Sequence, residues 1–240
     1  MTTIAVTGTK GSPGATTVAL ALAAITAAQA PLLVEADPAG GDLAARCGAT
    51  LDCGLVTFAA STRRGMGHAT VDAHAQLLPS GVRALLAPTS GDQASSALRS
   101  IGAAFGPTLR DDDSLVIIDG GRWDTHSPAG AVIAAASVAI LVLRPTLEGV
   151  EHARCHLTSL AALVDRVVVA CIGERPYPRD EVRGALPVDE LYVVADDAGA
   201  ANALGRCVRP AAWLRRSSLM RTASALADQI LDAHDPITAR

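Results

Sequence analysis

The chain has 240 residues, half of them hydrophobic, with a net charge of −4 and a pI near 5.8. This length suits one substantial hydrophobic core better than two, so we expect a single domain over residues 1–240. The net charge excludes a strongly basic surface over the whole molecule, so any nucleic-acid contact must be local. Aromatic residues make up only 2% of the chain, which favours small aliphatic side chains packed in layers.

The sequence predicts a soluble, cytoplasmic protein without membrane insertion. Residues 3–6 lead at once into a glycine-rich loop, which leaves no room for a secretory signal peptide. The apolar runs around residues 18–30 and 131–143 are interrupted or too short to span a bilayer. The cysteines are odd in number and contain no C-x-x-C pair, so we interpret them as reduced thiols. They are Cys47, Cys53, Cys155, Cys171 and Cys207.

Short apolar strands alternate with helical segments along the chain. The predicted strands cover residues 3–6, 32–35, 115–118, 138–143, 167–172 and 191–194. The predicted helices cover residues 16–29, 92–104, 129–136, 147–164 and 217–233. Two apolar bursts within residues 76–87 flank a Pro-Ser-Gly turn and predict a hairpin. The pattern indicates an α/β fold with a doubly wound, mostly parallel sheet and helices on both faces. Ligands of such sheets bind beyond the carboxyl ends of the strands.

A glycine-rich loop lies between the first strand and the first helix, at residues 6–17 (VTGTKGSPGATT). Backbone N–H groups of such a loop and the positive end of the helix dipole form a cradle for phosphates. Thr16 is placed to ligate Mg²⁺, and Thr17 to contact a phosphate oxygen. Lys10 is the only lysine, since the other 19 basic residues are arginines, and this suggests a specific role. The alternative is that the glycines merely form a strand-to-helix turn.

This loop resembles the deviant Walker A motif, K-G-G-x-G-K-[ST]-[ST], of MinD, ParA and the related pilus-assembly proteins TadZ and CpaE. Matching residues are Lys10, Gly11, Gly14, Thr16 and Thr17. The resemblance implies a P-loop NTPase fold that binds ATP and Mg²⁺ through residues 10–12 and 14–17. It also implies that Lys10 is the signature lysine, which reaches the partner's phosphates across a nucleotide-sandwich homodimer.

Two loop positions depart from the motif. Ser12 replaces the second glycine, and Ala15 stands where the family has the lysine that contacts the β- and γ-phosphates. Loss of a charged donor should cost about 1.5 to 3 kcal/mol of phosphate binding, and it should impair phosphoryl transfer more severely. Degenerate loops at this place are frequent in TadZ and CpaE, so the chain is most similar to those members.

Two later segments extend the resemblance. Residues 35–38 (EADP) resemble the switch I motif D-x-D-P, with Glu35 in place of the first Asp. Residues 115–121 (LVIIDGG) resemble a Walker B strand followed by switch II. The resemblance implies that Asp37 orients the attacking water or a Mg²⁺-bound water, and that Asp119 holds Mg²⁺ through water. Taken on its own, Asp37-Pro38 favours a simple turn. The family's adenine-contacting Asn is absent from residues 171–176, so base specificity is not assigned.

An arginine-rich segment lies near the C-terminus. No acidic residue occurs between Ala198 and Ala227, but the segment contains Arg206, Arg209, Arg215, Arg216 and Arg221. The resemblance to ParA implies nonspecific DNA binding here, and the alternative is a solvated helix flank or a protein contact. Asp228 and Asp232 on the last helix argue against the basic membrane-binding helix of MinD.

Together these features predict an ATP-dependent homodimer that acts as a positioning or assembly factor, with slow or no ATP hydrolysis. Its partner would be a pilus or secretion assembly protein or a polar landmark. Lys10 and Asp37 are the candidate catalytic residues, and Thr16, Asp37 and Asp119 the candidate Mg²⁺ ligands. One alternative is a nucleotide-independent scaffold with a vestigial loop. Another is a ParA-like DNA-partitioning ATPase that uses residues 206–221.

Overall fold

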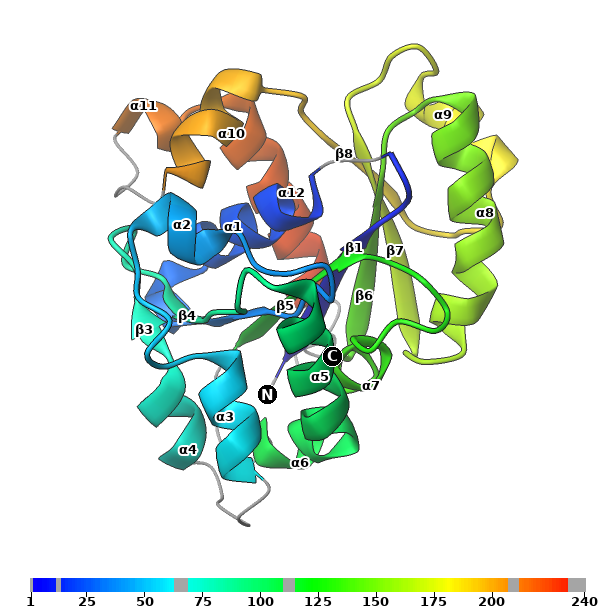
Figure 1. Cartoon of the computed structure of the whole chain (residues 1–240). Helices are drawn as coiled ribbons and strands as arrows, with labels where there is room; N and C mark the ends of the chain where they lie inside the picture. The colour runs from blue at the N-terminus through cyan, green and yellow to red at the C-terminus, as the bar shows by residue number, and fades with distance from the viewer. Residues whose placement is uncertain (1, 12–13, 63–68, 110–114, 207–211, 233–240) are drawn as a thin grey trace, which may run out of the picture.

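A single eight-stranded sheet runs through the described part of the chain, in the order β3-β4-β2-β5-β1-β6-β7-β8 (Figure 1). The computed structural model describes residues 2–11, 14–62, 69–109, 115–206 and 212–232. Neighbouring strands are parallel except for β3, which pairs antiparallel with β4. The strands are β1 (Thr3–Gly8), β2 (Leu32–Glu35), β3 (Gln76–Leu77), β4 (Arg83–Leu85), β5 (Val116–Arg122), β6 (Val138–Leu143), β7 (Arg166–Ile172) and β8 (Leu191–Val194).

Helices cover both faces of the sheet, as Figure 1 shows. One face carries α1 (Ala15–Ile25), α2 (Leu43–Cys47), α10 (Ala198–Gly205), α11 (Ala212–Arg215) and α12 (Ser218–Asp232). The other carries α3 (Leu55–Thr62), α4 (Ala69–His74), α5 (Gly91–Ile101), α6 (Phe105–Leu109), α7 (Gly130–Ile133), α8 (Leu147–Ala161) and α9 (Arg179–Ala185). The predicted doubly wound α/β fold is therefore confirmed.

Each central strand contributes to two separate apolar layers, because successive side chains of a strand point to opposite faces. In β6, Val138, Ile140 and Val142 pack on the side of α1. Ala139, Leu141 and Leu143 pack on the side of α8. The strand is buried on both faces, which explains its uninterrupted apolar sequence.

The strands were predicted better than the short helices. The predicted bounds of β2, β6 and β8 agree with the structure, and the predicted hairpin is β3–β4. The strand predicted over residues 115–118 continues to Arg122, which pairs with Gly8 after a register shift. Several helices that the sequence did not indicate are present, among them α2, α3, α9 and α10. Two of these, α2 and α10, border the site described below.

Strand register gathers acidic residues at one edge of the sheet. The central strand β1 lies between β5 and β6, so the glycine-rich loop begins at the middle of the carboxyl edge. Asp119 is paired in register with Glu35 on one side and with Val6 on the other. Asp37 follows β2 by two residues, and its charge acts on Asp119.

The prediction that all cysteines are reduced is wrong for Cys47, which is disulfide-bonded. Cys53, Cys155 and Cys171 are free thiols. The fifth cysteine, Cys207, lies outside the described residues. Chain spacing did not reveal the bond because a disulfide joins residues that are close in space, often far apart in sequence.

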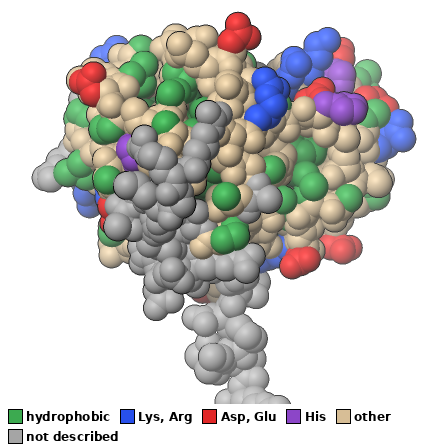
Figure 2. Space-filling model, turned by 60° about the horizontal axis from the view of Figure 1, so that its bottom comes forward, with side chains coloured by type: hydrophobic (Ala, Val, Ile, Leu, Met, Phe, Trp, Pro, Cys, Tyr) green, Lys and Arg blue, Asp and Glu red, His purple; other side chains and the backbone are tan. Residues whose placement is uncertain are grey.

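The surface carries charges of both signs. On the face shown in Figure 2, most acidic and basic side chains lie toward the edges of the view, and the visible hydrophobic side chains are scattered between them. None of the helices in the described ranges is both long and apolar enough to cross a membrane.

Candidate functional site

The loop after β1 presents free backbone donors at the start of α1. The backbone N–H of Thr9 donates to the carbonyl of Val142 (3.0 Å), which fixes the loop against β6. Gly11 and Gly14 have φ angles of 72° and 142°, which residues with a side chain rarely adopt. No described side chain caps the first turn of α1, and that turn has no acidic residue. Its N–H groups are therefore available to an anion. Ser12, predicted to belong to this loop, lies outside the described residues.

Asp119 is a buried carboxyl group with one unsatisfied oxygen. It is 1% exposed, and its Oδ1 accepts a hydrogen bond from the N–H of Gly121 (3.2 Å). Its Oδ2 is buried without a hydrogen-bond partner among the described residues. Burial raises the pKa of Asp119 to about 7; the Thr16 hydroxyl and the Gly121 N–H oppose this shift, and the nearby acidic groups add to it. A buried oxygen that lacks a donor, beside a threonine hydroxyl, suits a hard cation such as Mg²⁺.

Asp37 belongs to the segment that resembles switch I, and its side chain lies against the segment that resembles switch II. Its Oδ1 accepts a hydrogen bond from the N–H of Ala39 (2.8 Å). The carboxyl group lies against Gly121, where a β-carbon would overlap it. Burial raises the pKa of Asp37, and the charge of Arg122 opposes that shift. Asp37 and Arg122 both line a cavity of about 430 Å³. Asp124 and His126 line the same cavity, so a water or a ligand group in it would meet side chains of both charge types.

Glu35 has a structural role that the sequence did not reveal. Its carboxylate is 2% exposed and accepts three backbone hydrogen bonds. Oε1 accepts from Asp42 (2.8 Å) and Leu43 (2.9 Å), and Oε2 accepts from Ala87 (3.0 Å). Burial raises the pKa of Glu35, while these three N–H groups oppose the shift. The carboxylate thus fixes the start of α2 and the end of β4 beside the loop, and has no free oxygen for a metal.

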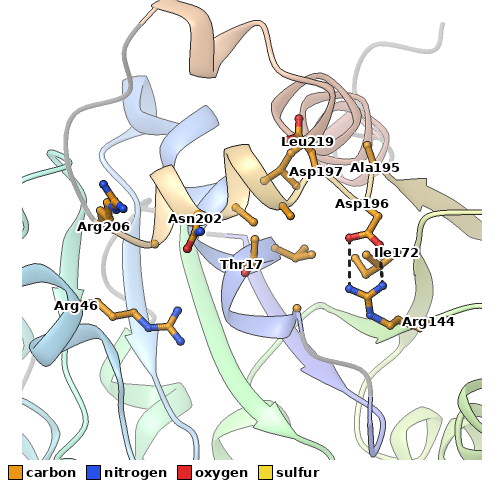
Figure 3. A pocket seen from close by; sticks show the side chains of 15 residues that line it. Thr17, Arg46, Arg144, Ile172, Ala195, Asp196, Asp197, Asn202, Arg206 and Leu219 are labelled. Atoms are coloured by element: carbon orange, nitrogen blue, oxygen red, sulfur yellow. Dashed lines mark hydrogen bonds and ion pairs between the residues drawn. The ribbon is translucent and has the colours of Figure 1, made fainter.

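A cavity of about 650 Å³ opens beside the loop (Figure 3). Gly14, Thr17 and Val18 form one wall, and the chain after β7 and β8, together with α10, forms the others. Arg144 spans one end of the cavity and makes two hydrogen bonds to Asp196, of 2.8 and 3.3 Å. The charged side chains around the cavity are Arg46, Arg144, Asp196, Asp197 and Arg206. Its volume falls within the range of pockets that enclose small molecules.

The structure brings most of the predicted site residues to this edge of the sheet. The two adjacent threonines diverge: Thr16 interacts with Asp119, whereas Thr17 lines the large cavity. Ala15 is 7% exposed and packs into the apolar layer below the loop. Lys10 is exposed and forms no ion pair with a described residue. Among the described residues, it therefore forms no ion pair with Asp37 or Asp119.

Sequence reasoning missed the charged residues around the large cavity. Arg46 lies on a five-residue helix, α2, in a region interpreted only as polar and glycine-containing. Asp197 did carry a readable signal, because an Asp before an alanine-rich run is a helix N-cap. Its side chain accepts a hydrogen bond from the N–H of Ala200 (3.0 Å). Recognising α10 from this cap would have placed Asn202 and Arg206 near the site.

Solved structures share this arrangement of strands and helices. MinD of Pyrococcus horikoshii, the septum site-determining protein, complexed with Mg-ADP, matches with a TM-score of 0.79 and 17% identity, covering 100% of this chain and 99% of that one. A ParA family ATPase from Chlorobium tepidum matches with a TM-score of 0.74 and 15% identity, covering 94% and 97%. Cobyrinic acid a,c-diamide synthase from Mycobacterium smegmatis, with a bound ATP analog and magnesium, matches with a TM-score of 0.69 and 19% identity, covering 98% and 96%.

No protein-family model and no curated protein sequence matches the chain. The structural likeness at such low identity shows the fold: this chain has the P-loop ATPase fold of MinD and ParA. Because the same fold also occurs in a biosynthetic synthase, function has to be argued from the site.

Proposed function

We propose that the chain is a single nucleotide-binding domain that binds ATP with Mg²⁺, forms a homodimer in that state and serves as a positioning or assembly factor with slow or no hydrolysis. The observation that carries this proposal is the buried, unpartnered Oδ2 of Asp119, next to Thr16 at the foot of an uncapped glycine loop. A structural turn has no need of an unsatisfied buried carboxylate oxygen, whose desolvation is costly.

The site fits a magnesium nucleotide. Thr16 and Asp119 offer oxygen ligands to Mg²⁺, with Asp37 nearby, and the N–H groups at the start of α1 face outward for phosphates. When bound, the metal would neutralise charge on the phosphate oxygens. The large cavity beside Thr17 has room for the rest of a nucleotide. The bound Mg-ADP of MinD and the bound ATP analog and magnesium of the synthase support this proposal.

Slow or absent hydrolysis follows from Ala15. A methyl group occupies the position of the loop lysine, so the loop offers no internal positive charge to the transferred phosphoryl group. Asp37 remains available to orient water, so residual turnover depends on it. Binding can persist because backbone donors supply the rest of the cradle.

Lys10 provides the test of the dimer. Its exposed side chain, without a described ion-pair partner, is free to contact a second copy. Light scattering with Mg-ATP should show a dimer for the wild type and a monomer for Lys10→Ala. Arg99→Ala, which alters another exposed basic residue, on α5, should dimerise like the wild type.

The nucleotide-independent scaffold makes the opposite prediction in this experiment. A dimer that forms equally with and without ATP, and that Lys10→Ala leaves intact, would replace our proposal with the scaffold. A monomer under all conditions would contradict the dimer in both hypotheses.

A DNA-partitioning role is a second candidate, because arginines of the C-terminal segment are exposed. Arg206, Arg215, Arg216 and Arg221 are all at the surface, whereas Arg209 lies outside the described residues. Phosphate contacts would produce salt-dependent, sequence-independent DNA binding. The double variant Arg215→Gln/Arg216→Gln should then weaken retardation of nonspecific DNA at low salt. If the wild type retards no DNA at low salt, this candidate fails.

A further inference from the structure

The large cavity contains positive charge from outside the loop. Of its three arginines, Arg144 is bound to Asp196 (2.8 Å). Arg46 reaches the cavity from α2, and Figure 3 shows its guanidinium directed toward the start of α1, where Thr17 lies. Arg206 lines the same cavity from the end of α10 but is directed elsewhere in that view. Arg46 is therefore the arginine best placed to meet a ligand on the loop.

The position of Arg46 is set by the packing of α2. Leu43, Ala44 and Cys47 are buried on one side of this helix, so Arg46 extends from the other side. The backbone N–H groups at the start of α2 are held by Glu35, and Cys47 at its end is disulfide-bonded. A short helix held at its start by these hydrogen bonds and along one side by apolar packing places its arginine beside the cavity.

Arg46 forms an ion pair with Asp42, and a bound anion could replace Asp42 as its partner. Its Nη2 binds Oδ2 of Asp42 (2.9 Å) one turn earlier, and the two side chains are 42% and 68% exposed. Exposed pairs of this kind contribute little, about 0.2 to 1 kcal/mol. A guanidinium has five N–H donors in a planar fork that matches phosphate oxygens. A nucleotide can therefore attract Arg46 without breaking a strong interaction.

We propose that Arg46 binds the phosphate chain of the nucleotide and supplies, from α2, the positive charge that Ala15 does not supply from the loop. This inference rests on the proposed nucleotide-binding function. In this arrangement, an arginine on α2 compensates for the lysine that the loop lacks at position 15. Glu35 is a positioning residue in this arrangement, because it holds α2 in place.

The test measures ATP affinity by calorimetry in the presence of Mg²⁺. Arg46→Gln should weaken binding by about tenfold to a hundredfold, the effect of removing a charged hydrogen-bond donor. Arg46→Lys should fall between the wild type and Arg46→Gln, because lysine retains the charge but not the fork. Arg154→Gln is the matched control, since Arg154 also pairs with an acid one turn away, Glu151, on the exposed surface of α8. It should bind ATP like the wild type.

A second variant separates ligand contact from a structural role. Asp42→Asn removes the competing carboxylate, so it should leave ATP binding unchanged or strengthen it by up to about fivefold. If the Arg46–Asp42 pair only stabilised α2, both variants would weaken binding together, and the proposal would be overturned. Wild-type binding that is indifferent to Arg46→Gln would overturn this inference alone, whereas no ATP binding by the wild type would overturn the proposed function.

Discussion

At the scale of single residues, Asp119 is an unusual group: a fully buried carboxyl with an unsatisfied oxygen. Other buried acidic atoms at this edge are satisfied; the oxygens of Glu35 accept three backbone hydrogen bonds. Burial raises the pKa of Asp119, and the charges of Glu35 and Asp37 raise it further. One of its oxygens accepts no hydrogen bond from a described residue. Such an arrangement lowers the stability of the folded protein when Asp119 is ionised, and either a proton or a bound cation relieves it.

This arrangement predicts a pH dependence of stability in the absence of metal. Asp119 has a folded-state pKa of about 7, against an ordinary value of 3.8. Between these values the folded protein retains a proton that the unfolded chain has released, so stability falls as pH rises from about 4 to about 7 and then levels off. The slope from one such group reaches at most about 1.4 kcal/mol per pH unit.

Denaturant unfolding of the wild type and Asp119→Asn in EDTA measures this dependence. The variant should lack the slope contributed by Asp119, and at pH 8 it should be more stable than the wild type by about 1 to 2 kcal/mol. Parallel pH profiles of the two proteins would contradict the buried, cation-seeking role of Asp119.

The cysteines give a second prediction at this scale. Cys155 is exposed, whereas Cys171 is buried and burial raises its pKa to about 12. An alkylating reagent at pH 8 should therefore modify Cys155 in the native protein and Cys171 only after unfolding. Cys47 should react only after addition of a reductant. Peptide mapping by mass spectrometry checks all three, and modification of Cys47 without reductant would exclude the disulfide.

At the scale of elements, α2 depends on contacts that bring its N-terminus against β2 and β4. Gly41 precedes this helix, and a β-carbon there would overlap Glu35 Oε2 and lie 2.7 Å from the carbonyl oxygen of Ala87. Gly41→Ala should destabilise the protein by about 1 to 3 kcal/mol, because neither neighbour can move without breaking hydrogen bonds. Gly184→Ala on α9 is the control, since a β-carbon there meets nothing within 4 Å. Thermal unfolding should show a lower midpoint only for Gly41→Ala; equal midpoints would mean that α2 is not held tightly.

The same elements show which parts of the fold could be read from the sequence. Strands such as β6 were found because buried parallel strands are uninterrupted apolar runs between turn residues. Helix α2 was missed because five residues are too few to display a helical period. The placement of α2 depends on hydrogen bonds to Glu35, and a local sequence pattern does not predict such hydrogen bonds.

Some residues of the candidate site could be found from the sequence, and others could not. Lys10, Asp37 and Asp119 were singled out because each occupies a defined position in a sequence motif, one in the glycine loop and two at strand ends. Arg46 and Arg206 were not assigned to the site, because they reach the cavity through the packing of α10 against α1 and of α2 against α10. The unsatisfied oxygen of Asp119 is likewise a property of the folded chain alone.

At the scale of the whole molecule, the sheet order places the loop at the end of the central strand. The acidic residues Glu35, Asp37 and Asp119 lie on one side of the loop, and the large cavity lies on another. The central claim is that these parts form one site for a magnesium nucleotide. A phosphate loop retained only as a structural turn would leave Asp119 without a ligand and the cavity without an occupant.

Calorimetric titration of the wild type and Asp119→Asn with ATP, with Mg²⁺ and with EDTA, tests this claim most directly. We predict saturable binding of about one ATP per chain that requires Mg²⁺ and is weakened about tenfold or more in Asp119→Asn, since a charged ligand of the metal is lost. Absence of binding by the wild type at millimolar ATP, or equal binding by both proteins with and without Mg²⁺, would contradict it.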